Sequence, residues 1–128
     1  MEQFQNSSQG KDWESFIEEI FDYLSERTNG QAFAGCPYAV MGMETALSKP
    51  TIAAVFMEGL KNFEQIFLEV LLHSGLSQDH AKILSQRMLS IYQGYLLLGR
   101  ISDDTSYLKN ARKNMLETYR EYRSFHGI

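Results

Sequence analysis

The stretch Ser77–Arg100, SQDHAKILSQRMLSIYQGYLLLGR, decides the fold of this 128-residue chain. Its spacing predicts a helix, and its second half, from Met88 to Gly99, carries no charged residue. One broad face of that helix, at about 100° per residue, holds Ala81, Leu84, Met88, Leu89, Tyr92, Tyr95 and Leu96. Ile83 and Leu97 lie on the opposite side. A helix that is apolar all round must be covered all round, so this stretch predicts a central or interface helix of an all-α domain.

The remainder of the chain predicts four more helices and no strand. Asp12 caps a first helix that Asn29-Gly30 ends, and residues 1–11 before it are polar and predict a flexible lead-in. The other expected helices cover about 37–47, 51–74 and 104–125. We therefore expect a five-helix orthogonal-type bundle, with a lead-in over 1–11 and one helical ligand-binding and dimerisation domain over 12–128.

Composition and charge limit the possible functions. The chain is 44% hydrophobic and 22% charged, which is typical of a globular domain, and its net charge of −4 argues against nucleic acid or an anionic membrane as the main partner. Cys36 is the single cysteine, which excludes an internal disulfide and predicts a cytoplasmic protein. The longest uncharged apolar stretch is far short of the roughly 20 residues that span a bilayer.

Catalytic and metal-binding patterns are missing from the sequence. His73, His80 and His126 have no metal-ligand spacing with one another or with Cys36. There is no glycine-rich phosphate loop, no GxSxG elbow and no Glu-x-x-His pair. We expect a protein that is not an enzyme and that uses no metal and no cofactor.

Two further signals each allow a structural and a functional interpretation. Cys36 precedes Pro37 at a helix start, where a thiol can serve as a redox sensor, but no neighbouring base supports that function and a packed thiol is favoured. The last helix carries basic residues on one side, which suit either a phosphate-binding stripe or a solvated face: Lys109, Arg112, Lys113, Arg120 and Arg123. Glutamates flank this side, and the solvated face is favoured.

The all-round apolar helix predicts a dimer. Four other helices can cover one side of it, and a second copy of the same surface most economically covers the other in a C2 interface. The residues expected in that interface are Tyr95, Leu98, Leu108, Ala111, Met115 and Tyr119. The alternative is a monomer in which this helix is simply central.

The order and spacing of several motifs resemble a known family. These motifs are Gly35-Cys36-Pro37 opening a short helix that reaches Glu44, Pro50 starting a long helix, His73-Ser74-Gly75-Leu76, and YQGYLLLGR at Tyr92–Arg100. From about residue 13 to 122 the chain resembles the C-terminal regulatory domain of TetR-family transcriptional repressors, most closely the lincomycin-resistance-repressor-type branch. The resemblance implies an effector-binding domain whose last two helices form a four-helix bundle with a partner subunit.

The resemblance also implies a small-molecule pocket enclosed by the earlier helices. The residues expected to line it are Trp13, Phe16, Tyr38, Met41, Glu44, Phe56, Phe63 and Tyr92, because aromatic and methionine side chains suit adaptable apolar pockets. The expected effector is small and mainly apolar or amphiphilic, with at most one cationic or donor group for Glu44. For each aromatic residue the alternative is core packing, and for Glu44 it is a capping, surface or ion-paired position.

The family carries an N-terminal three-helix DNA-binding domain, and no residues before Asp12 supply one. We therefore expect no DNA contact by this chain alone. Two origins remain open: a truncated regulator, or a natural protein without the DNA-binding domain. A second function also remains open, in which the chain binds no ligand and pairs with itself or with a full-length relative.

Overall fold

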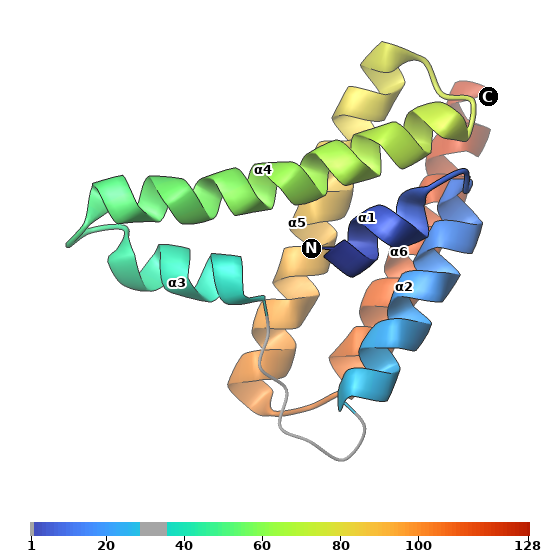
Figure 1. Ribbon diagram of the computed structural model, residues 1–128. Helices are drawn as coiled ribbons and strands as arrows, with labels where there is room; N and C mark the ends of the chain where they lie inside the picture. The colour runs from blue at the N-terminus through green and yellow to red at the C-terminus, as the bar shows by residue number, and fades with distance from the viewer. Residues whose placement is uncertain (1, 29–35) are drawn as a thin grey trace.

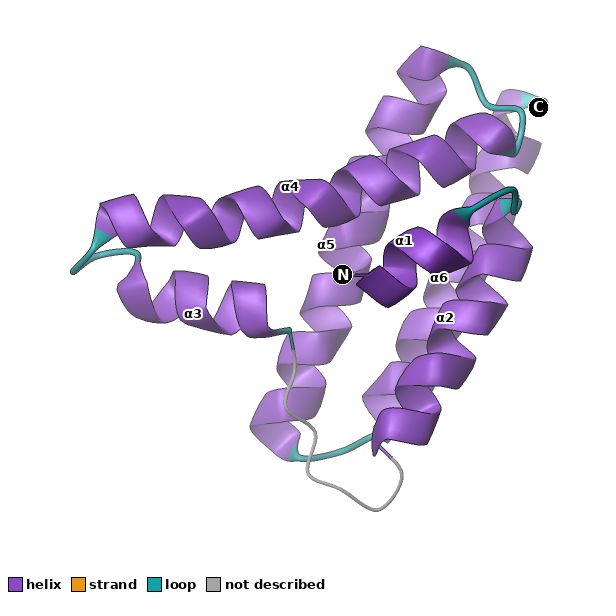
Figure 2. Cartoon of the chain, in the orientation of Figure 1, coloured by secondary structure: helices purple, strands orange, loops and turns teal. Residues whose placement is uncertain are grey.

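The computed structural model describes residues 2–28 and 36–128, which form helices joined by short loops (Figures 1 and 2). The helices are α1 (Glu2–Ser8), α2 (Trp13–Thr28), α3 (Pro37–Thr45), α4 (Pro50–His73), α5 (Gln78–Ser102) and α6 (Ser106–His126). No strand occurs in these two stretches, and the all-α prediction is confirmed. The sequence predicts one helix fewer, because it does not predict α1.

The flexible lead-in predicted for 1–11 is wrong for Glu2–Ser8, which form α1. The reason lies in tertiary packing. Phe4 is only 4% exposed, and its ring meets the ring of Phe63 edge to face at a centroid distance of 4.8 Å. A helix of seven residues is too short to persist alone, so burial of this aromatic ring stabilises a segment whose local composition is polar.

Figure 1 shows α2, α5 and α6 running side by side, with α4 crossing them. The packing contacts agree: α6 lies against both α2 and α5, and α4 lies against α5. The helix α3 packs along α4, and the two form a hairpin that extends to the left of the other helices in Figure 1. The short helix α1 contacts α2 and α4. The α3–α4 hairpin thus packs on one side of the layer formed by α2, α5 and α6.

Two helices begin at the capping residues that the sequence predicts, Asp12 and Ser77. An Asp12 carboxylate oxygen accepts a hydrogen bond from the backbone N–H of Ser15 at 2.9 Å, before α2. The hydroxyl of Ser77 accepts one from the backbone N–H of His80 at 3.3 Å, before α5. Asp103 ends α5 in the left-handed conformation with a φ of 54°. These local signals define the helices before any tertiary contact is considered.

The apolar face of α6 packs into the core of its own chain. Four of the six residues predicted for the dimer interface are buried there: Leu108, Ala111, Met115 and Tyr119. The prediction assigned this face to a second subunit, but in the structure α2 and α5 cover it. Any apolar surface can bury the apolar face of a helix. The sequence of α6 therefore does not determine whether its apolar face packs against the same chain or against a second subunit.

Candidate ligand site between α3 and α5

Four of the eight predicted ligand residues lie in the aromatic core. Trp13, Phe16, Phe63 and Tyr92 are each 5% exposed or less, and ring contacts link them into one cluster. Phe4 fills the space between Phe16, Phe63 and Tyr92. Burial raises the pKa of the Tyr92 phenol well above its ordinary value of 10, so the hydroxyl stays neutral. For these four residues the core-packing alternative describes the structure.

The other four predicted ligand residues lie on the α3–α4 hairpin. Tyr38 is half-buried, with its ring at the edge of Phe63 at 5.9 Å, and Phe56 is also half-buried. Met41 and Glu44 are exposed. The structure therefore brings Tyr38 to the aromatic cluster and leaves Met41 and Glu44 at the surface.

The placement of Glu44 corrects one expectation. The sequence predicts a carboxylate facing a closed apolar cavity, where it would read a cationic or donor group. Glu44 instead lies exposed in the last turn of α3, which is the surface alternative. An exposed carboxylate is hydrated and screened, so it gives little selectivity for a buried ligand group.

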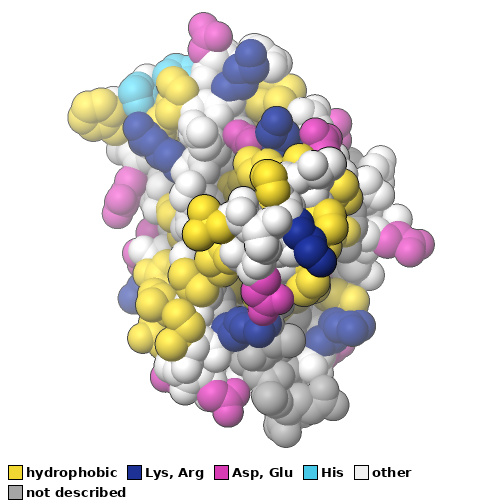
Figure 3. All heavy atoms as spheres, turned by 90° about the vertical axis from the view of Figure 1, so that its left-hand side faces the viewer, with side chains coloured by type: hydrophobic (Ala, Val, Ile, Leu, Met, Phe, Trp, Pro, Cys, Tyr) yellow, Lys and Arg dark blue, Asp and Glu magenta, His cyan; other side chains and the backbone are white. Residues whose placement is uncertain are grey.

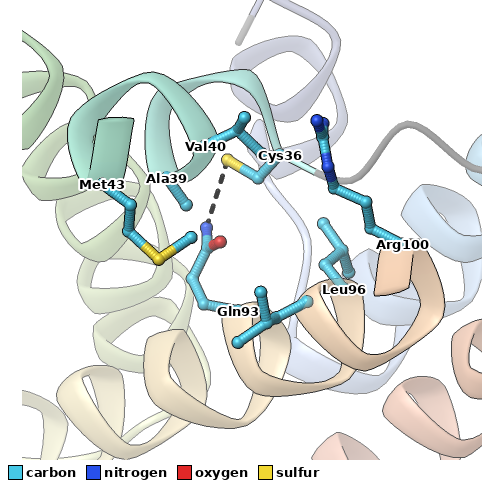
Figure 4. Close-up of a pocket in the computed structure, with 8 residues that line it drawn as sticks. Cys36, Ala39, Val40, Met43, Gln93, Leu96 and Arg100 are labelled. Atoms are coloured by element: carbon cyan, nitrogen blue, oxygen red, sulfur yellow. Dashed lines mark hydrogen bonds between the residues drawn. The ribbon is translucent and has the colours of Figure 1, made fainter. Parts of the chain in front are cut away.

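A pocket lies where α3 faces α5 (Figure 4). Its lining residues are Cys36, Ala39, Val40, Met43, Gln93, Leu96, Leu97 and Arg100. Its cavity volume is about 20 Å³, room for about one water-sized group. Cys36 and Leu96 are buried, whereas Met43 and Leu97 are exposed, so the pocket has a covered floor and an open mouth.

Gln93 and Arg100 are the two residues with polar side-chain N or O atoms in a lining that is otherwise mostly apolar. The side-chain N–H of Gln93 donates to Sγ of Cys36, with 3.3 Å between Nε2 and Sγ. The other amide atom, Oε1, is shielded from solvent and has no hydrogen-bond partner among the described residues. The sequence analysis missed Gln93, although a glutamine inside the uncharged stretch from Met88 to Gly99 is itself a signal of polar chemistry at a covered position.

The wall that α3 contributes packs along α4, and the two helices approach closely at a glycine of α4. A Cβ at Gly59 on α4 would lie 2.8 Å from Cγ of Tyr38, so the absence of a side chain there lets the Tyr38 ring lie on the helix backbone. On α3 itself, a Cβ at Gly42 would lie 3.6 Å from Cβ of Phe56. No residue of α3 is fully buried. The α3 wall is therefore held by half-buried side chains that pack on α4.

The exposed side of α5 carries apolar residues that no other described element covers. These are Ile83, Leu98 and Ile101, with exposed fractions between 47% and 74%. At about 100° per residue they share a sector with the small residues Ser90 and Gly94 and with Arg87, whose guanidinium lies over the Tyr122 ring. We call this set the α5 stripe. Of the predicted interface residues, Leu98 belongs to it, and Tyr95 is half-buried beside α6 with its hydroxyl 2.8 Å from Nδ2 of Asn114.

Apolar side chains are also exposed on the α3–α4 hairpin, which projects toward the viewer in Figure 3. They include Met41, Met43, Leu47, Ile52, Val55 and Met57. Met43 belongs both to this surface and to the pocket lining. The mouth of the pocket therefore opens among apolar side chains.

The described residues contain neither a group of metal ligands nor a membrane-spanning helix. Within 2–28 and 36–128, no three His, Cys, Asp or Glu side chains are grouped so that they could hold a metal ion. In the same ranges, every helix is either too short or too polar to cross a bilayer.

Comparison with known proteins places this arrangement in a family. Residues 13–114 match the family described as transcriptional regulator LmrA/YxaF-like, C-terminal domain, and this range includes the whole pocket lining and the α5 stripe. The chain belongs to this TetR-type family. The LmrA/YxaF-like match confirms the resemblance drawn from the motif order, and it identifies the chain as a domain of a transcriptional regulator.

A curated relative agrees. The chain is 26% identical over 84 residues to a protein of Bacillus subtilis (strain 168) described as an uncharacterized HTH-type transcriptional regulator, YxaF. The match covers 66% of this chain and 44% of that protein, so the chain spans less than half of the relative's length. No solved structure matches the chain.

Proposed function

We propose that this domain binds a small, mainly apolar effector between α3 and α5 and dimerises through the α5 stripe, as the regulatory part of a TetR-type transcriptional regulator. The observation that carries the proposal is the pocket itself: it lies inside the family-matched region, and apolar side chains form most of its lining. Such a lining selects apolar ligands because burial of apolar surface is favourable in water.

The effector must widen the pocket, because about 20 Å³ holds only one small group. We expect the α3 wall to move, since no residue of α3 is fully buried. A ligand between α3 and α5 would shift the population toward a state in which α3 lies farther from α5.

The dimer places two α5 stripes against each other. Ser90 and Gly94 lie in the middle of the stripe, where small side chains let two helices approach closely, and Ile83 and Ile101 lie toward its two ends. A stripe that is apolar at both ends can meet a second copy in a C2 arrangement. This interface differs from the one predicted, because it uses the outer side of α5 and not the buried face of α6.

We propose that the chain alone does not bind DNA. Its net charge is −4, and arginines of α6 are engaged within the chain. Arg112 pairs with Glu18 of α2, and Arg120 pairs with Glu14 at 2.5 Å.

Thermal shift measurements test effector binding. A panel of N-alkylbenzamides, alkylamines and alkyl carboxylates is added to the wild type and to an Ala39→Phe variant that fills the pocket. A ligand at about 100 times its Kd adds about 2.7 kcal/mol of stability. We expect several degrees of stabilisation in the wild type, none in A39F, and an unchanged response in the control Ala54→Phe on the exposed side of α4.

The second function is an interaction protein that pairs with a full-length relative and binds no ligand. The exposed α5 stripe is the observation that favours it. No stabilisation by any compound, together with heterodimers of this chain and a full-length LmrA/YxaF-like regulator in native mass spectrometry, would support this function instead. Equal shifts in wild type and A39F would place the ligand outside the pocket.

A further inference from the structure

We infer that Gln93 is the recognition group of the pocket and that it selects ligands carrying a neutral or cationic N–H or O–H donor. This inference rests on the proposed effector-binding function and names the chemistry of the ligand. It also moves polar recognition from Glu44, where the sequence places it, to α5.

The orientation of the Gln93 amide determines which of its atoms is available to a ligand. Figure 4 shows the Gln93 side chain standing up from α5 into the space beneath α3, with its nitrogen toward Cys36. One N–H of the nitrogen donates to Sγ at 3.3 Å, whereas the oxygen is shielded from solvent without any donor among the described residues. The amide atom that has no hydrogen-bond partner among the described residues is therefore the acceptor.

A shielded carbonyl oxygen without a donor is unfavourable, because folding removed its water and returned no hydrogen bond. A ligand donor at this point restores the bond, whereas an ester or carboxylate oxygen brings a second acceptor and repels the first. Most of the surrounding lining is apolar, including Ala39, Val40 and Leu96. The water-sized space fits the donor end of a ligand, and the remainder would lie along the mouth beside Met43 and Leu97.

Cys36 allows a test without knowledge of the natural effector. It is the only cysteine of the chain and lines the same pocket. Its thiolate attacks a fragment disulfide, forms a new S–S bond to the fragment and releases 2-mercaptoethanol as the leaving thiolate, which takes up the proton. The fragments are the 2-mercaptoethanol mixed disulfides of N-propyl-2-mercaptoacetamide, of its N-methyl derivative and of propyl 2-mercaptoacetate.

Retention of each fragment is measured by intact mass spectrometry at equilibrium with excess 2-mercaptoethanol. We expect the wild type to retain the secondary amide about 5- to 10-fold more strongly than the N-methyl amide or the ester, since only the secondary amide has a donor. Gln93→Met should abolish this preference. Gln86→Met, an identical change at an exposed position of α5, should leave it intact.

Equal retention of the three fragments, stronger retention of the ester, or a preference that survives in Q93M would each overturn the inference. The comparison of the secondary amide with the N-methyl amide uses wild-type protein alone. It therefore tests the inference even if Q93M does not fold. Those outcomes leave the proposed function standing if the amphiphile panel still stabilises the wild type and not A39F. No retention by native protein, with full labelling in 6 M urea, would overturn the inference by showing that the pocket admits no ligand.

Discussion

The indole N–H of Trp13 donates a hydrogen bond to the backbone carbonyl of Met115, with 3.1 Å between Nε1 and the carbonyl oxygen. This bond joins the first residue of α2 to the middle of α6. The backbone N–H of Trp13 also donates to the hydroxyl of Ser74 at the end of α4, at 2.8 Å. One residue therefore ties α2 to two helices that are distant in sequence.

Replacement of Trp13 by Phe should lower the free energy of unfolding by about 2–3 kcal/mol, because it removes a buried hydrogen bond and leaves a void in a fully buried position. Urea denaturation followed by circular dichroism measures the change. Tyr23→Phe, at a half-buried position on the same helix, is the control and should change stability by less than about 0.5 kcal/mol. A similar loss in both variants would contradict the assigned role of Trp13.

Gly59→Ala should destabilise the domain by about 1–3 kcal/mol, although alanine is the better helix former, because its Cβ would overlap the Tyr38 ring. Gly42→Ala meets only ordinary contact and is the matched control on the same pair of helices. In a double-mutant cycle measured by urea denaturation, Gly59→Ala should cost much less in a Tyr38→Ala background. Strict additivity of the two changes would show that the ring does not restrict this position.

Leu98→Glu should weaken dimerisation by at least about 100-fold, because it would bury a charge in the α5 stripe. Leu47→Glu, at a fully exposed position of the α3–α4 hairpin, should leave the dimer intact. Analytical ultracentrifugation over a range of concentrations measures both. A monomeric wild type at tens of micromolar would refute the dimer, and a dimer insensitive to L98E would place the interface elsewhere.

Asp12 should make α2 sensitive to acid. The hydrogen bonds from the backbone and side chain of Ser15, with a smaller contribution from His73, hold the pKa of this carboxyl below its ordinary value of 3.8. A depressed folded-state pKa stabilises the native state above the unfolded pKa, and this contribution is lost as the pH falls through the folded pKa. Asp12→Ala should cost about 0.5–2 kcal/mol at pH 7 and much less near pH 2.

Urea denaturation of both proteins at the two pH values measures this difference. Asp12→Asn is the matched control, because its amide oxygen still caps the helix but does not titrate. The free energy of unfolding of the Asp12→Asn variant, relative to that of the wild type, should therefore rise as the pH is lowered. An Asp12→Ala cost that is the same at pH 7 and pH 2 would show that the carboxylate charge does not stabilise the cap.

The candidate site was only partly predictable from the sequence. Aromatic content identified Trp13, Phe63 and Tyr92 as large side chains on converging helices, but composition does not distinguish a ring that lines a cavity from one that fills it. In the structure the buried ring of Phe4 fills the space between the other aromatic rings, so these rings do not line a cavity. Phe4 belongs to a segment that has no helical signal of its own. The sequence does not single out Gln93, because its importance depends on an oxygen that has no partner among the described residues, and only atomic contacts reveal this.

The sequence by itself determined the helices from Trp13 onward, their caps at Asp12 and Ser77, and membership of the LmrA/YxaF-like family, because helix periodicity and capping are local and family motifs are linear. Only the tertiary structure decided which apolar face meets which partner. In the structure Met115 and Tyr119 are buried within the chain, whereas Leu98 and Glu44 are exposed at its surface. Hydrophobic burial has no direction, so a sequence states that a face must be covered but not what covers it.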